Sequence, residues 1–119
     1  MTVAEALNRR ELDRYLQRVG DRWLLTAARL GGARAEDALG AGPQRERGQE
    51  YVVVLVSEQF GGVPWLERVH QCGSLWDASE MGGRADVHCY TPQEYERKLA
   101  SLPVVARAHD HGIDLLGQG

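Results

Sequence analysis

The sequence contains little of several residue types, and each shortage narrows what the protein can be. It has two cysteines, one phenylalanine and a single lysine, Lys98, among 119 residues. Two cysteines with no secretory signal argue against a disulfide framework and predict a protein of the reducing cytoplasm. No apolar run is long enough to span a membrane. The thirteen arginines, together with abundant alanine and glycine, are typical of a GC-rich bacterial coding bias.

Charge of neither sign dominates the sequence. The formal net charge is −3, and no stripe of basic residues is present, which argues against binding along an extended nucleic-acid surface. A chain of this length supports one hydrophobic core, so residues 1–119 are predicted to form a single domain. The composition leaves open whether that domain forms a homo-oligomer.

One stretch organises the rest of the chain. Residues 51–56 form an unbroken apolar run rich in β-branched side chains, with Glu50 before it and the pair Gly61 and Gly62 shortly after it. Such a run is typical of a strand that is buried on both faces. We therefore expect a strand that does not lie at the edge of its sheet and that helices or other strands cover.

The segment before this strand is predicted to contain a helix, a strand and a loop. Apolar residues at helical spacing predict a helix over residues 3–19, which Gly20 ends. Residues 23–28 are predicted to form a short strand, with a break at Gly31 and Gly32. Residues 36–48 are rich in Gly, Pro, Glu and Arg, and this composition predicts a flexible loop.

The segment after the strand is predicted to alternate helix and strand. A stripe at helical spacing predicts a helix that begins near Pro64 and packs on the sheet; its members are Trp65, Val69, Cys72, Trp76 and Ser79. Residues 85–90 predict a strand. Thr91, Pro92 and Glu94 are typical of a capped helix start.

The chain is predicted to end with one more helix and one more strand. Pro103 begins the helix and Gly112 ends it, and residues 113–116 predict an edge strand. The order of elements predicts a small α/β (α+β) domain with a mixed sheet of three or four strands, covered by helices mainly on one face.

The central strand and the segments after it resemble the minimal nucleotidyltransferases. The resemblance covers residues 24–116, and its more specific half consists of the following positions: Phe60, Trp65 to Arg68, Leu75, Trp76, Ala85, Asp86, Tyr90 to Glu96, and Ala108 to Gly112. Members of this family transfer a nucleotidyl group from a nucleoside triphosphate to a hydroxyl group, and some are the antitoxin of a two-gene pair. The resemblance implies a nucleotidyltransferase-like fold.

The resemblance also implies where a nucleotide and its metal ions would bind. A glycine loop would hold the triphosphate, which implies Gly32 and Arg34 as binding residues, although Ala33 replaces the expected serine. Of three carboxylates that would hold two Mg²⁺ ions, only Glu50 and Asp86 can be matched. Because too few carboxylates leave the repulsion between two ions uncompensated, we expect no cofactor, with Mg²⁺ only if residual nucleotidyl transfer survives.

Acid–base chemistry is a second possibility at this site. Side chains alternate along a strand, so Asp86 and His88 are expected to share one face. We expect them to face a concave pocket walled by Val52, Val54 and the loop near Arg34. A histidine beside a carboxylate is a candidate acid–base pair, which makes both residues candidate catalytic residues. The alternative is that His88 is a partly buried structural residue.

Three functional hypotheses therefore remain open. The first is a nucleotidyltransferase-like protein with a degraded site, which binds a small molecule or nucleotide in its cleft or a protein encoded nearby. The second is a small-molecule enzyme that uses Asp86 and His88 in the old nucleotide cleft. The third is a residual metal-dependent nucleotidyltransferase. None of the three predicts a nucleic-acid or membrane partner.

Overall fold

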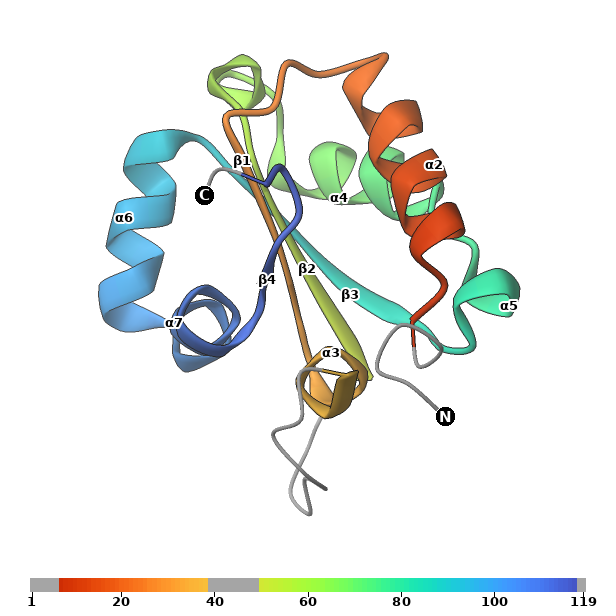
Figure 1. Cartoon of the computed structure of the whole chain (residues 1–119). Helices are drawn as coiled ribbons and strands as arrows, with labels where there is room; N and C mark the ends of the chain where they lie inside the picture. The colour runs from red at the N-terminus through yellow and green to blue at the C-terminus, as the bar shows by residue number, and fades with distance from the viewer. Residues whose placement is uncertain (1–6, 39–49, 118–119) are drawn as a thin grey trace.

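The computed structural model describes residues 7–38 and 50–117, which form one small α+β domain (Figure 1). The elements of the N-terminal half are α2 (Arg9–Gly20), β1 (Ala27–Gly31) and α3 (Ala33–Ala38). Those of the C-terminal half are β2 (Tyr51–Val56), the 3-10 helix η1 (Glu58–Phe60), α4 (Trp65–Gly73), α5 (Ala78–Met81), β3 (Ala85–Tyr90), α6 (Pro92–Ser101), α7 (Pro103–His111) and β4 (Ile113–Asp114). None of the described helices is long and apolar enough to cross a membrane.

The four strands form one mixed sheet in the order β3-β2-β1-β4. β2 runs parallel to β3, and β1 runs antiparallel to both β2 and β4. All six residues of β2 are buried. The predictions that this strand is buried on both faces and does not lie at the edge are therefore confirmed.

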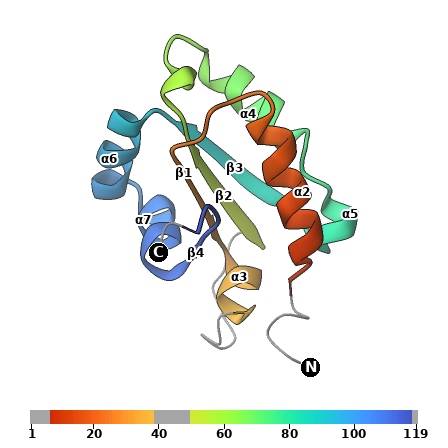
Figure 2. The same cartoon turned by 45° about the horizontal axis from the view of Figure 1, so that its top comes forward.

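Alternate residues of β2 belong to two separate apolar clusters, one on each face of the sheet. Tyr51, Val53 and Leu55 belong to the larger cluster, together with buried residues of α2, α4 and α5. Val52, Val54 and Val56 belong to the smaller cluster with residues of α6 and α7. Figure 2 shows α2, α4 and α5 on one side of the sheet and α6 and α7 on the other. The sheet is thus covered more extensively on the α2 face.

Local signals explain most of the C-terminal half. The Thr91 side chain accepts a hydrogen bond from the Glu94 backbone N–H, and the Glu94 side chain accepts one from the Thr91 N–H, so the predicted capping box begins α6. Pro103 begins α7, which Gly112 follows. The strand over residues 85–90 has the predicted bounds, and a short edge strand follows α7 as expected.

The single helix predicted after Pro64 is in fact two. α4 ends at Gly73, and a new helix starts because the Asp77 side chain accepts a hydrogen bond from the Glu80 backbone N–H. Trp76 lies in the break and still packs against the rings of Tyr15 and Tyr51. Trp65, the first residue of the predicted stripe, was expected to pack on the sheet, but it is 40% exposed.

The N-terminal half departs further from the sequence predictions. The helix predicted over residues 3–19 spans Arg9–Gly20 within the described residues. The predicted strand over 23–28 begins only at Ala27 and continues through Gly31, because Ala27–Gly31 is the segment that pairs with residues 52–56 of β2. Gly32 then turns the chain at φ 96, where a Cβ atom would lie 2.6 Å from the Glu50 carbonyl oxygen.

The predicted loop over residues 36–48 is wrong at its start. Residues 36–38 belong to α3, and residues 39–48 lie outside those that the structure describes. The Glu36 carboxylate is 3% exposed and accepts two hydrogen bonds of 2.7 Å from the Arg107 guanidinium of α7. This pairing with a distant element stabilises a turn of helix that local composition does not favour.

Candidate functional site

Asp86 and His88 lie on the same face of the sheet, as predicted. They belong to β3, where they pair with Val52 and Val54 of β2, whose side chains lie in the smaller apolar cluster. Tyr90 follows two residues later on the same face and belongs to that cluster. Strand alternation alone therefore aligns three polar side chains along one edge of the sheet.

These three side chains form a continuous chain of hydrogen bonds. His88 Nε2 lies 2.9 Å from Asp86 Oδ2, and His88 Nδ1 lies 2.9 Å from Tyr90 Oη. The His88 side chain is 12% exposed, whereas that of Asp86 is 43% exposed. An imidazole with little contact to solvent thus connects a carboxylate at the surface to a buried phenol. From the sequence, His88 was expected beside Asp86, but no role was expected for Tyr90.

The hydrogen-bonding roles follow from the chemistry of the three groups. An ionised carboxylate only accepts, so His88 Nε2 carries a proton and donates it to Asp86. In the neutral imidazole Nδ1 is then an acceptor, and Tyr90 donates its hydroxyl proton to it. Burial, and next the charge of Asp86, raise the pKa of Tyr90 to about 12. Tyr90 is therefore a phenol, not a phenolate, at neutral pH.

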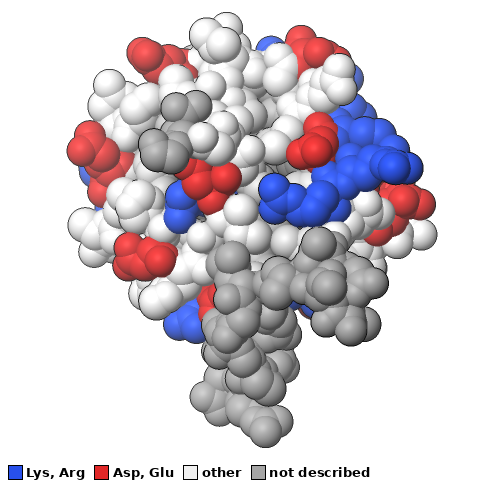
Figure 3. Space-filling model, in the orientation of Figure 1, with Lys and Arg blue, Asp and Glu red and all other residues white. Residues whose placement is uncertain are grey.

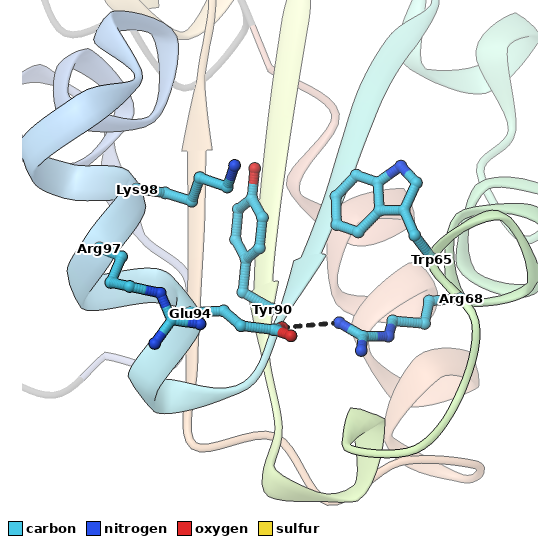
Figure 4. A pocket seen from close by; sticks show the side chains of 6 residues that line it. All are labelled: Trp65, Arg68, Tyr90, Glu94, Arg97 and Lys98. Carbon is cyan, nitrogen blue, oxygen red and sulfur yellow. Dashed lines mark hydrogen bonds and ion pairs between the residues drawn. The ribbon is translucent and has the colours of Figure 1, made fainter.

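A pocket of about 290 Å³ opens where Tyr90 ends this chain. Figure 4 shows its lining, which comes from α4, β3 and α6: Trp65, Arg68, Tyr90, Glu94, Arg97 and Lys98. The Trp65 ring stacks on that of Tyr90, with centroids 5.2 Å apart and planes at 29°. Asp86 and His88, which were expected to face a pocket, do not line this one. The expected walls are absent from its lining as well, namely Val52, Val54 and Arg34, so this pocket lies nearer the C-terminal end of β3 than the expected one.

Arg68 and Glu94 also line the pocket, and their side chains make hydrogen bonds that stabilise the fold. Arg68 donates to Glu94 Oε1 at 2.7 Å and to the carbonyl oxygens of Val63 and Cys89. The Arg68 hydrogen bond lowers the pKa of Glu94, against the opposing effect of burial. These contacts tie the start of α6 to α4 and to β3. The remaining cations of the pocket, Arg97 and Lys98, are both exposed and have no ion-pair partner among the described residues.

The residues implied by the nucleotidyltransferase resemblance are divided between the two faces. The Arg34 guanidinium lies 3.3 Å from Glu50, donates to the Gly82 carbonyl oxygen at 2.8 Å, and lies over the Tyr51 ring. The Tyr51 side chain belongs to the cluster on the α2 face, opposite Asp86 and His88. Gly32 makes the turn before α3. Arg34 and Glu50 are therefore paired with each other and not with the Asp86–His88 pair.

The metal ligands that the resemblance implied are not gathered into a cluster. Glu50 interacts with Arg34, and Asp86 interacts with His88. Within residues 7–38 and 50–117 there is no group of three or more His, Cys, Asp and Glu side chains that could hold a metal ion. The described donor set thus lacks the carboxylates that a two-metal centre requires.

Two other features of the sequence have structural explanations. Cys72 and Cys89 are free, buried thiols between α4 and β3, as predicted, and the Cys72 thiol together with burial raises the pKa of Cys89. Figure 3 shows its largest basic area on the side of the molecule where Figure 1 shows α2. Arg14 and Arg18 both contact Glu11, and the Arg18 hydrogen bond lowers the pKa of that buried carboxyl. Arg14 and Arg18 of α2 are therefore partly neutralised by an acidic residue of the same helix.

Comparison with known proteins gave no family assignment. No family model, no curated protein and no solved structure matched this chain. The geometry of the site is therefore the main basis for a functional proposal.

Proposed function

We propose that this protein is a nucleotidyltransferase-like domain that binds a small molecule in the pocket between α4, β3 and α6. The observation that carries the proposal is the hydrogen-bonded chain from Asp86 through His88 to Tyr90, which ends at that pocket. A polar side chain such as the Tyr90 phenol in a concave site with an aromatic wall is typical of ligand pockets. An exposed tryptophan beside it supports the same proposal.

Metal-dependent nucleotidyl transfer is the weaker proposal for this site. Ala33 stands where the family has a serine, Val52 and Val54 stand on β2 beside Asp86 and His88, and Glu50 is paired with Arg34. Apolar side chains cannot hold Mg²⁺, which takes oxygen ligands. A protein partner encoded nearby stays a prediction, with no specific contact surface to support it.

The binding proposal can be tested by NMR with a library of single-ring and short aliphatic acids, amines and alcohols. We expect some of these compounds to bind and to shift the indole N–H signal of Trp65 and the amide signals of residues 88–98. The amide signals of α2, which lies on the other face of the sheet from α6, should stay unchanged. If no compound binds, or if those that bind shift signals elsewhere in the domain, the proposal is wrong.

The same hydrogen-bonded chain favours a second candidate function, acid–base catalysis on the bound molecule. A substrate proton transferred to Tyr90 Oη would accompany transfer of the phenol proton to His88 Nδ1. The imidazolium so formed would be stabilised by Asp86, so that His88 is the base and Tyr90 conducts the proton. Conversion of a bound compound, followed by NMR over time, should be lost in Asp86→Asn and His88→Ala. Turnover that persists in both variants would refute this second candidate.

A further inference from the structure

The pocket combines an aromatic wall with a positive side. Trp65 presents an indole that is 40% exposed and held by its stacking on Tyr90. Across the pocket, α6 contributes Arg97 and Lys98, whose side chains Figure 4 shows extending from the helix on the side of Tyr90 away from Trp65. A planar ring gains most from a preorganised aromatic wall, because stacking adds to simple burial.

The charge of the pocket is opposite in sign to that of the whole chain. Its lining holds three cations, Arg68, Arg97 and Lys98, and one carboxylate, Glu94. The Arg68–Glu94 ion pair is internal, so the positive excess belongs to Arg97 and Lys98. The whole chain, by contrast, has a net charge of −3. This local excess favours an anionic ligand whose charged group lies against α6.

The hydrogen-bonded chain beside the pocket disfavours a second negative charge. Tyr90 lines the pocket, and because its hydroxyl proton is used in the hydrogen bond to His88, its oxygen can only accept a further hydrogen bond. Asp86 adds a carboxylate behind His88. A ligand group that approaches Tyr90 Oη is therefore stabilised if it is neutral or donates a hydrogen bond, and repelled if it is anionic.

Size sets a further limit on the ligand. A volume of about 290 Å³ lies just below the range of about 300–1,000 Å³ that is usual for pockets that bind drug-sized molecules. The pocket can therefore take one ring with its substituents, and it is small for a nucleoside triphosphate.

We infer that the pocket binds a small aromatic monocarboxylate, with its ring against Trp65 and its carboxylate on Arg97 and Lys98. This inference rests on the proposed small-molecule binding function and names the ligand class. It is independent of any catalytic role for His88.

Isothermal titration with five probes tests the inference. Benzoate and 4-hydroxybenzoate are the expected ligands. Cyclohexanecarboxylate has the same charge without the aromatic ring, and benzyl alcohol has the ring without the charge. We expect each of these two controls to bind at least fivefold more weakly than benzoate. Terephthalate, a dianion, should also bind more weakly than benzoate.

Matched variants locate the binding. Trp65→Leu, and separately the double variant Arg97→Gln with Lys98→Gln, should each weaken benzoate binding about tenfold or more. Arg10→Gln, an exposed arginine on α2, should leave it unchanged. All the substituted side chains are exposed, so the variants should keep the circular dichroism spectrum of the parent protein.

Each outcome decides between the two proposals. Equal binding of cyclohexanecarboxylate and benzoate would refute the aromatic preference, and equal binding of benzyl alcohol would refute the anion preference, while both would leave small-molecule binding intact. Benzoate binding that none of the variants weakens would place the site elsewhere and overturn the inference. Absence of binding by every probe would overturn this inference alone if other library compounds still bind at Trp65, and would overturn the proposed function as well if none does.

Discussion

Replacement of Arg68 by methionine should destabilise the domain strongly although the side chain lies near its surface. Methionine keeps much of the apolar stem and removes the guanidinium, whose carbon lies 5.9 Å from the centre of the Phe60 ring. The guanidinium is largely buried and donates to two carbonyl oxygens, those of Val63 and Cys89, and to the Glu94 carboxylate. The substitution therefore isolates the polar contacts of one residue.

The expected loss follows from counting those contacts. Hydrogen bonds from a charged donor each contribute about 1.5 kcal/mol or somewhat more. The Glu94 side chain is 31% exposed, so its contribution must be discounted for solvent screening. Because water can reach some of the freed groups, we expect a total loss in the free energy of unfolding of about 3 kcal/mol.

The sign of the pH dependence gives an independent check. The Arg68 hydrogen bond lowers the pKa of Glu94 in the folded protein below its ordinary value of 4.5. The resulting stability is present above that value and is lost as the pH falls through the lower folded pKa. The difference in stability between the parent protein and Arg68→Met should therefore shrink as the pH falls from about 5 toward 3.

Urea denaturation followed by circular dichroism measures both effects. Arg97→Met, a substitution of the same kind at an exposed position one turn beyond Glu94, should change stability by no more than about 0.5 kcal/mol. A loss below about 1 kcal/mol in Arg68→Met would refute the count of contacts. A difference that stays constant down to pH 3 would show that Glu94 is not the partner that matters.

Three further predictions concern the sheet and the site. Val53→Asp places an unpaired charge in the fully buried centre of β2, so it should cost several kcal/mol and prevent folding; soluble, folded protein with this change would contradict the placement of the strand. The pKa of Tyr90 is raised to about 12, against an ordinary value of 10.0. As the pH rises, Tyr90 therefore loses its hydroxyl proton in the unfolded chain before it does so in the folded protein. The free energy of unfolding should therefore fall between about pH 10 and 12, and it should fall less in Tyr90→Phe. If it falls equally in the parent protein and in Tyr90→Phe, the raised pKa of Tyr90 is refuted. Asp86→Asn and His88→Ala should each weaken ligand binding or turnover while the melting temperature stays within a few degrees, and a large loss of stability from either would favour a purely structural role.

The sequence by itself was enough to predict the elements that depend on apolar runs, on capping residues and on the alternation of side chains along a strand. The apolar run over residues 51–56 could only be a buried strand, and the Thr91 and Glu94 pair specified the start of α6 by capping. The alternation of side chains along a strand was also enough to place Asp86 and His88 on one face. These predictions succeeded because they depend on residues a few positions apart.

Tertiary structure decided the features that depend on distant residues. Whether residues 23–28 or 27–31 formed β1 depended on pairing with β2, and the helix at Ala33 depended on the ion pair between Glu36 and Arg107, 71 positions away. The pocket likewise joins Trp65 of α4 to residues of α6 across the end of β3. No local sequence pattern predicts that these residues lie together, because their proximity results from the packing of α4 and α6 around β3. The sequence alone thus determined which polar side chains share a face, and only the fold decided which pocket they serve.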